Sequence, residues 1–402
     1  MSGIRQCFRL LWLTLFQSRG TFARLTLKRI GALLILIPLL LILQICHWLG
    51  FLLDEIFFRR YRTIRVRTPV FILGLPRSGT TLLHKILSRD TENFTAMKLW
   101  EMLLAPSITE RKVLMTLAAI DRRLGGLGCR LLRVLDERIF ASGNTIHKIS
   151  LFQLEEDELL LLPLFSSIFL LHLFPFPQAL WHLVHFDSAT TPADKHRIMP
   201  FYYRCIQRHL YVHGSDKCFL SKNTAFSSKI DALNEYFPDA KVICNVRDPL
   251  QAIPSFLSYM HYIWGCIDND PRGYAFRDWL LEMAEHWYQH PIERLAYWPD
   301  DRHTIVFYDD LVTDPGLTTR EVYSRLGLDI SPVFAERLME EHVKSRMYRS
   351  EHTYSLSQYG LAPVDIIERF HHVIAYYDLG SNYSEIAAAY THDKLIALVD
   401  HA

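Results

Sequence analysis

The stretch VFILGLPRSGTTLLHKIL, residues 70–87, decides the fold of this 402-residue chain. Its first half is apolar and contains the β-branched residues Val70 and Ile72, a pattern that predicts a buried strand ending at Gly74. After a short polar loop, leucine and isoleucine recur with helical spacing at positions 82, 83, 86 and 87. The stretch therefore predicts a strand, a tight loop and a helix.

The loop has the glycine spacing of a phosphate-binding turn. Four residues separate Gly74 from Gly79, so successive backbone N–H groups can face an anion at the start of the helix. Thr80 stands where a nucleotide triphosphatase has its lysine. The fixed cation of the loop is Arg77, whose guanidinium can hold an anionic leaving group but cannot reach along a triphosphate. We expect a nucleotide with a short 5′ chain; the alternative is an ordinary strand-to-helix turn.

Residues 75–82, LPRSGTTL, resemble the 5′-phosphosulfate loop of sulfotransferases. The likeness is strongest to the branch that contains bacterial sulfotransferase-family proteins and protein-tyrosine sulfotransferases, and it extends over roughly residues 69–375. It implies that the donor is PAPS (3′-phosphoadenosine 5′-phosphosulfate), that no metal is required, and that the donor-binding residues of this loop are Arg77, Ser78, Gly79, Thr80 and Thr81. It also implies a catalytic role for Arg77, because charge develops on the leaving oxygen.

A second motif, AKVICNVRDPLQAIPS at residues 240–255, follows in the order that this family shows. Residues 241–246 read as a central strand, Arg247 follows at its end, and Ser255 comes eight residues later. In sulfotransferases an arginine and a serine at this spacing bind the 3′-phosphate of PAPS. The residue types suit that role, because arginine offers forked donors to a phosphate and serine adds a neutral one.

Three residues are candidates for the base that takes the proton of the acceptor hydroxyl. Glu101 follows the loop helix, where several sulfotransferase branches have their base, although it could be an exposed helical glutamate. His147 and Glu155 have the spacing of the histidine and the Pro-Glu-Glu motif of the bacterial branch, with Leu154 in place of the proline. Glu155 could instead begin a helix. The sequence leaves the choice open.

Three further residues are expected near the donor because family members carry them in similar segments. Lys222 ends a strand at 218–221, at the edge where parallel sheets bind nucleotides. Tyr308 ends a strand at 304–308 and can stack on adenine. Arg349 lies in a stretch that resembles the family's tail segment and would cover the 3′ side. Surface solvation is the alternative for Lys222 and Arg349.

The four strands at about 70–75, 218–221, 241–246 and 304–308 are separated by helical stretches. This alternation predicts a three-layer α/β domain of the P-loop NTPase type with a central parallel sheet, spanning residues 68–402. The apolar residues 159–173 are expected in the core or in the wall of an acceptor pocket. Together with Trp181 and Phe186 they favour a lipophilic acceptor.

Residues 1–67 form a basic N-terminal region with 11 Lys or Arg against 2 Asp or Glu. Within it, residues 30–53 carry no charge over 24 positions, which predicts a hydrophobic helix long enough to cross a membrane. Pro38 leaves a re-entrant or in-plane anchor open, and a buried helix of the domain is the other reading. Arginines on both sides leave the orientation unassigned.

The seven scattered cysteines include no C-x-x-C pair, which favours a reducing compartment. The domain is therefore expected to face the cytoplasm at a bacterial inner membrane, where PAPS is made, or the Golgi lumen in a eukaryote. The net charge of +1 and the lack of a basic patch beyond residue 67 argue against nucleic acid as a partner.

The sequence thus indicates a sulfotransferase that transfers a sulfuryl group from PAPS to a hydroxyl or amine of a small-molecule or lipid acceptor. A P-loop kinase or NTPase is the competing enzyme class, and Thr80 in the lysine position argues against it. A non-catalytic membrane protein that retains a nucleotide-binding fold is the other alternative.

Overall fold

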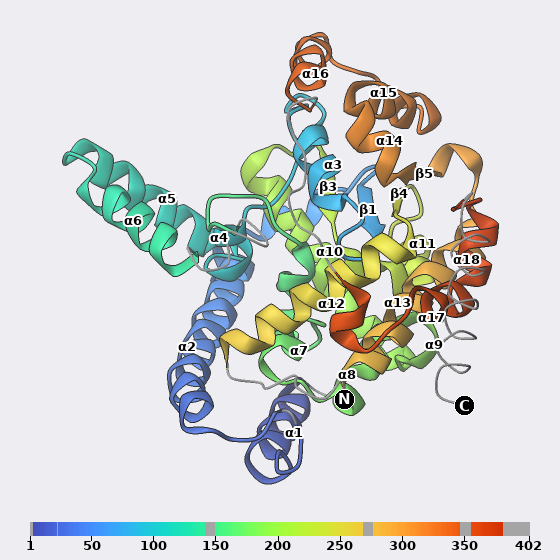
Figure 1. Ribbon diagram of the computed structural model, residues 1–402. Coiled ribbons are helices and arrows are strands. Elements are labelled where there is room, and N and C mark those ends of the chain that lie inside the picture. The colour runs from blue at the N-terminus through green and yellow to red at the C-terminus, as the bar shows by residue number, and fades with distance from the viewer. Residues whose placement is uncertain (1–2, 22, 141–148, 268–275, 346–354, 381–402) are drawn as a thin grey trace, which may run out of the picture.

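The computed structural model describes residues 3–21, 23–140, 149–267, 276–345 and 355–380, and its centre is a five-stranded parallel sheet (Figure 1). The strand order is β2-β3-β1-β4-β5. The strands are β1 (Val70–Gly74), β2 (Phe94–Thr95), β3 (Cys218–Lys222), β4 (Lys241–Val246) and β5 (His303–Phe307). All four strands expected from the sequence are confirmed. The edge strand β2 is only two residues long, too short to show any periodicity.

Strand β1 occupies the middle of the sheet. It pairs with β3 on one side, where Val70 is opposite Leu220, and with β4 on the other, where Gly74 is opposite Asn245. Strands β2 and β3 thus lie on one side of β1, and β4 and β5 lie on the other. The strand order therefore reverses direction at β1, which is a topological switch point. In open parallel sheets this is the place where ligands bind.

Alternate residues of β1 enter two hydrophobic cores, one on each face of the sheet. Val70 and Ile72 belong to the smaller core, with helices α3 (Thr80–Leu87), α14 (Tyr308–Thr313), α15 (Pro315–Arg325) and α16 (Pro332–Ser345). Phe71 and Leu73 belong to the larger core, with α8 (Pro177–Val184), α9 (Phe186–Ala189), α10 (Pro192–His213), α11 (Ile230–Tyr236), α12 (Pro249–Cys266) and α13 (Arg277–Leu295). These layers confirm the predicted three-layer α/β domain.

Shorter elements complete the larger core. The apolar run 159–173 forms the 3-10 helix η2 (Asp157–Leu164) and the helix α7 (Leu170–Leu173), and it is largely buried, as expected for core. The other short helices are α4 (Leu99–Leu103), α17 (Pro363–Arg369) and α18 (His371–Tyr376). Helices α5 (Ile108–Arg123) and α6 (Leu127–Phe140) form a hairpin that projects from the domain (Figure 1).

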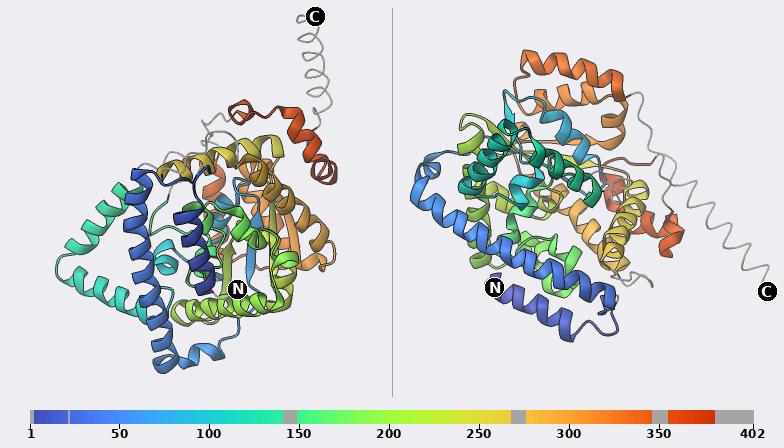
Figure 2. Two further views of the ribbon diagram at one scale, coloured as in Figure 1. Left: turned by 90° about the horizontal axis from the view of Figure 1, so that it is seen from below. Right: turned by 90° about the vertical axis from the view of Figure 1, so that its left-hand side faces the viewer.

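The N-terminal region consists of α1 (Gly3–Phe16) and α2 (Leu27–Phe57). The predicted hydrophobic helix is therefore confirmed and is longer than the uncharged stretch at both ends. Among the described residues, α2 is the one helix whose length and apolar composition suit a membrane span. Figure 2 shows α1 and α2 together along one side of the domain.

Candidate active site

The loop between β1 and α3 is held in a conformation that few residues adopt. Gly74 has φ of 134°, and a Cβ atom there would lie 2.2 Å from the carbonyl oxygen of Asn245. Gly79 has φ of 88°, and its missing side chain makes room for the ring of Tyr308. Arg77 also has a positive φ, 77°, which is uncommon for a residue other than glycine. Such backbone strain is often found at functional sites.

Donors suited to an anion gather at this loop. Helix α3 begins at Thr80, so the N–H groups of Thr80 and Thr81 lack intrahelical acceptors and face the loop, whereas the N–H of Leu82 donates to the carbonyl oxygen of Gly79 across 3.0 Å. The Oγ atom of Ser78 is buried and has no hydrogen-bond partner. A buried hydroxyl without a partner is costly unless a ligand supplies one. The loop therefore fits a small, strongly accepting group such as a phosphate or a sulfate ester.

The two sequence motifs converge at this loop. The Nε atom of Arg77 donates to the Oγ atom of Ser255 on α12 across 3.0 Å. Nη1 of Arg247 donates to the carbonyl oxygen of Arg77 across 3.0 Å, and the guanidinium of Arg247 lies 4.0 Å from the centre of the Tyr308 ring. Four predicted donor-binding residues thus form one cluster at the carboxyl ends of β1, β4 and β5.

Residues that the motifs did not single out fix this cluster. Gln251 accepts hydrogen bonds from Nε and Nη2 of Arg247, and the hydroxyl of Tyr288 donates to the backbone carbonyl of Arg247 across 2.6 Å. Nδ2 of Asn245 lies 3.4 Å from the carbonyl oxygen of Ser78. Asn245 is a polar residue in an otherwise apolar strand, two positions before Arg247. This exception to the apolar pattern is a sequence signal that could have identified it as a site residue.

Lys222 joins the phosphate loop to an acidic pair. Its buried Nζ atom lies 3.2 Å from Thr81 Oγ1, 3.6 Å from a carboxylate oxygen of Glu155 and 3.4 Å from one of Glu156. Burial opposes the charge of Lys222, but the two carboxylates outweigh it and raise the pKa of the ammonium group. Lys222 is therefore positively charged, and its ammonium group links Glu155 to Thr81 of the phosphate loop.

A second acidic pair lies behind this site in the core. Asp157 accepts from the hydroxyl of Tyr202 across 2.7 Å and from Asn223, and burial raises its pKa to about 7. Glu158 is paired with Lys229 across 2.7 Å, and both side chains are fully buried. This network ties η2 to the end of β3 and so positions Glu155 and Glu156, which precede it in the chain.

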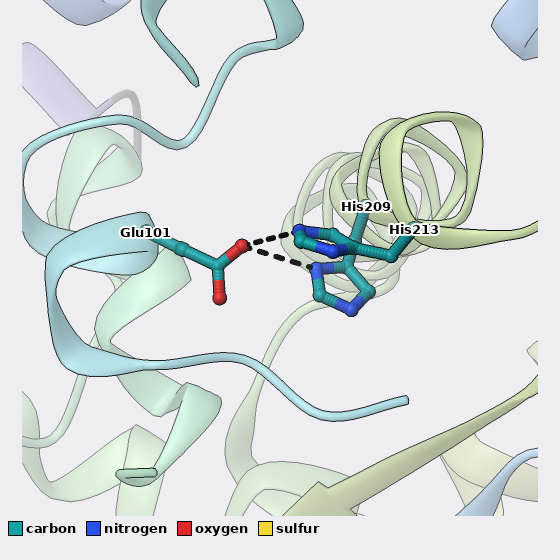
Figure 3. A group of neighbouring side chains, drawn as sticks. All are labelled: Glu101, His209 and His213. Atoms are coloured by element: carbon teal, nitrogen blue, oxygen red, sulfur yellow. Dashed lines mark hydrogen bonds and ion pairs between the residues drawn. The ribbon is translucent and has the colours of Figure 1, made fainter. Parts of the chain in front are cut away.

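Glu101 lies in a different cluster, made with residues of α10 (Figure 3). One oxygen lies 2.6 Å from Nε2 of His213 and 3.8 Å from Nη1 of Arg111, and the other accepts from the N–H of Lys98 across 2.9 Å. Burial favours the neutral acid, but these partners outweigh it and lower the pKa of Glu101 to about 2. These partners, His213, Arg111 and Lys98, lie outside the phosphate loop, and so low a pKa makes Glu101 a weak base.

The same cluster is the one described group of side chains arranged like metal ligands. Ligand atoms of Glu101, His209 and His213 lie within 4.8 Å of one another. However, Nη1 of Arg111 lies 2.9 Å from Nδ1 of His209, which must therefore accept, leaving Nε2 to donate to Thr95. Because the guanidinium already supplies the positive charge, these residues do not fit a metal ion.

Two predicted site residues, His147 and Arg349, lie outside the described residues. The structure brings together Arg77, Ser78, Gly79, Thr80, Thr81, Lys222, Arg247, Ser255, Tyr308 and Glu155 around one loop. It places Glu101 in the separate cluster on α4.

A model of the sulfotransferase family matches residues 69–332, which include the phosphate loop, the acidic pairs and the Arg247 motif. The chain therefore belongs to the sulfotransferase family, and its function is sulfuryl transfer. This confirms the family that the sequence motifs indicated.

Two curated relatives are each 26% identical to this chain over 322 residues, covering 78% of this chain and 75% of their own length. Both are omega-hydroxy-beta-dihydromenaquinone-9 sulfotransferases Stf3, from Mycobacterium bovis and Mycobacterium tuberculosis.

Solved structures share the fold. Sulfotransferase STF9 from Mycobacterium avium has a TM-score of 0.66 at 19% identity and covers 82% of both chains. Sulfotransferase STF1 from Mycobacterium tuberculosis has a TM-score of 0.58 at 19% identity, with 80% of this chain and 81% of that one covered.

Proposed function

We propose that this sulfotransferase uses PAPS as its donor and transfers the sulfuryl group to a hydroxyl of a lipophilic acceptor. The observation that carries the donor assignment is the 3.0 Å hydrogen bond between Arg77 and Ser255, which joins the 5′ and 3′ motifs. Two anion-binding motifs in contact suit a nucleotide with a phosphate at each end. A nucleoside triphosphate would need a lysine at position 80, where the chain has threonine.

The loop would hold the 5′-phosphosulfate through the N–H groups of residues 79–81, the hydroxyl of Ser78 and the guanidinium of Arg77. Arg247 and Ser255 would hold the 3′-phosphate, with Tyr308 fixing the plane of the Arg247 guanidinium. Lys222, held next to Thr81, would add positive charge where the leaving oxygen becomes negative. In these roles, backbone N–H groups, a hydroxyl and positively charged side chains of the protein stabilise the negative charge of the donor.

Of the two candidate bases that the structure describes, Glu155 and Glu101, the geometry favours Glu155. It is beside Lys222 at the loop, whereas Glu101 is paired with His213 and Arg111 in a separate cluster. Glu156 is engaged with Thr224, whose Oγ1 donates to it across 2.8 Å. In the reaction the acceptor oxygen bonds to sulfur and its proton passes to Glu155. The bond from sulfur to the 5′-phosphate oxygen breaks, and adenosine 3′,5′-bisphosphate leaves.

A line of aromatic rings beside the site supports a lipophilic acceptor. The ring centres of Phe169 and His172 are 5.1 Å apart, and those of His172 and Tyr259 are 6.4 Å apart. Burial lowers the pKa of His172 to about 4, so its ring is neutral and suits an apolar environment. The Stf3 relatives, whose name gives a menaquinone as acceptor, point to the same chemical class.

We also infer that the domain faces the cytoplasm, since all seven cysteines are free. The donor and acceptor proposals are tested by incubating membranes that contain the full chain with ³⁵S-labelled PAPS and extracting the lipids. We expect label in the organic phase, its loss in Arg77→Ala, and its retention in Arg325→Ala, which changes an exposed arginine of α15. Unchanged labelling in Arg77→Ala would contradict the donor assignment, and label confined to water-soluble products would contradict the lipophilic acceptor.

A further inference from the structure

Helix α2 has two opposite faces with different surroundings. One face is buried or half-buried against the domain and contains Arg29, Leu33, Gln44, His47, Phe51 and Asp54. The opposite face is apolar and exposed and contains Ile35, Ile42, Ile45, Leu49, Leu52 and Ile56. Both sets recur at three- and four-residue spacing, so each forms a stripe along the helix.

The packed stripe is fixed to the domain near both ends of the helix. At the start, Nη2 of Arg29 donates to the carbonyl oxygen of Leu173, and at the end Asp54 accepts from the N–H of Ile108 across 2.9 Å and pairs with Arg208. Between them, Gln44 donates to the carbonyl oxygen of Leu162 across 3.1 Å, and His47 bonds Glu110 across 2.7 Å.

These contacts are incompatible with a helix that crosses a bilayer alone. Arg29 and Asp54 are 25 residues apart in the sequence, about 37 Å along a helix, which exceeds the ~30 Å of a hydrocarbon core. If α2 crossed, the parts of the domain that contact the middle of the helix, including Leu162 and Glu110, would have to lie in the hydrocarbon with it. Charged groups there are costly.

Helix α1 adds a second exposed apolar stripe next to the first. Its packed side is attached to α8, since Nε2 of Gln6 donates to the carbonyl oxygen of Ala179 across 2.8 Å. Its exposed side presents Ile4, Phe8, Trp12, Leu15 and Phe16. Figures 1 and 2 show α1 beside the first turns of α2. We call the two exposed stripes together the α1–α2 face.

Exposed basic residues flank the two helices of this face along the chain. Of the eleven Lys and Arg residues in residues 1–67, ten are exposed, and Arg29 is the buried one. They occur along α1, before α2 and, as Arg59, Arg60, Arg62, Arg65 and Arg67, after it. Apolar exposed helices flanked by basic residues have the chemistry of an interfacial segment on anionic lipid.

We propose that the α1–α2 face lies flat on an anionic bilayer, with α2 parallel to the membrane surface and the whole domain on one side. This mode of membrane attachment is independent of the proposed donor and of the proposed acceptor.

Topology is tested by labelling single cysteines in sealed vesicles with a membrane-impermeant maleimide. In a chain with Cys7, Cys46, Cys129, Cys218 and Cys266 changed to serine, which keeps only the buried Cys205 and Cys244, one accessible cysteine is introduced before α2, as Arg24→Cys, or after it, as Arg60→Cys; both sites are exposed. We expect the two variants to be labelled from the same side. Labelling of one variant in sealed vesicles, and of the other only after detergent is added, would overturn the proposal.

Lipid binding is tested by flotation of the full chain with phosphatidylcholine vesicles, with or without phosphatidylglycerol. We expect greater recovery with the anionic vesicles, weakened by salt, and at least a tenfold loss in the triple variant Ile35→Gln, Ile42→Gln, Ile45→Gln. Leu317→Gln, an exposed leucine on α15, is the matched control. Equal flotation of the triple variant, or a stable detergent-free dimer that buries this face, would overturn the proposal. Because no donor is added, failure here is separate from failure of the proposed function.

Discussion

The Nε atom of Arg77 donates a hydrogen bond to the Oγ atom of Ser255 across 3.0 Å, although the two residues are 178 positions apart. One belongs to the loop after β1 and the other to α12, so the contact depends on the pairing of β1 with β4. It brings the two ends of the proposed donor site to one place. It also means that Ser255 affects both ends, because it orients Arg77 and offers a donor to the 3′-phosphate.

We therefore expect Ser255→Ala to weaken donor binding. A hydrogen bond to a charged group contributes about 1.5–3 kcal/mol, so the Kd for adenosine 3′,5′-bisphosphate should rise by roughly 10- to 100-fold. Titration calorimetry measures this directly. Ser258→Ala, three positions and about one turn further along α12, should leave the Kd unchanged. Equal affinity in both variants would remove Ser255 from the site.

Arg247 should not tolerate replacement by lysine. Its planar guanidinium lies against the Tyr308 ring and donates to Gln251 and to the Arg77 carbonyl, a set that an ammonium group cannot reproduce. We expect Arg247→Lys and Tyr308→Leu each to weaken bisphosphate binding by about tenfold, in line with cation–π energies of ~1–2 kcal/mol. Tyr308→Phe keeps the ring and should bind normally. Weak binding by Tyr308→Phe would instead assign the role to the hydroxyl.

The sequence was sufficient to predict the sheet and the donor loop because their signals are local. An apolar β-branched run, two glycines and a helical repeat are adjacent in the chain around Arg77, and the Arg247 motif has the same form. The sequence predicted four of the five strands and missed the two-residue β2. The convergence of Arg77, Arg247 and Ser255 agrees with the rule that parallel strands present their carboxyl ends at one edge.

The role of Glu101 and the placement of α2 could not be predicted because they depend on distant partners. Glu101 is held by His213, which is 112 positions away. The apolar composition of residues 30–53 suits both a transmembrane helix and a helix that lies on the domain. Only the contacts of Arg29, Gln44 and Asp54 distinguish the two.

Glu155 and Glu101 should respond differently to the same substitution. Loss of a general base commonly lowers the rate by 10²–10⁴, so we expect Glu155→Gln to lower kcat by about that factor while bisphosphate binding stays within about threefold. Glu101→Gln should keep most of the turnover of the molecules that remain folded. Single-turnover transfer of label from PAPS measures both. A large loss of kcat in Glu101→Gln with normal stability would reassign the base.

The ionised Glu101 should make the protein less stable in acid. Its pKa is lowered to about 2 in the folded chain from an ordinary value of 4.5, so the unfolded chain binds a proton first as the pH falls. The stability that Glu101 contributes is complete above pH 4.5 and is lost between pH 4.5 and 2. Urea unfolding across this range should show a steeper loss for the natural chain than for Glu101→Gln. Parallel curves would mean that Glu101 is not the ionised partner of His213 and Arg111.

The buried pair of Glu158 and Lys229 should matter for folding and, through folding, for the position of Glu155. Lys229→Met leaves the Glu158 carboxylate buried without its cation, which typically costs about 3–5 kcal/mol. The double variant Lys229→Met, Glu158→Gln removes both charges and keeps an amide that can accept from the N–H of Ile168, as Glu158 does across 3.0 Å. Urea unfolding should therefore show a large loss of stability in the single variant and partial recovery in the double variant. If the double variant were the less stable of the two, the pair would contribute through packing and hydrogen bonds and not through its charges.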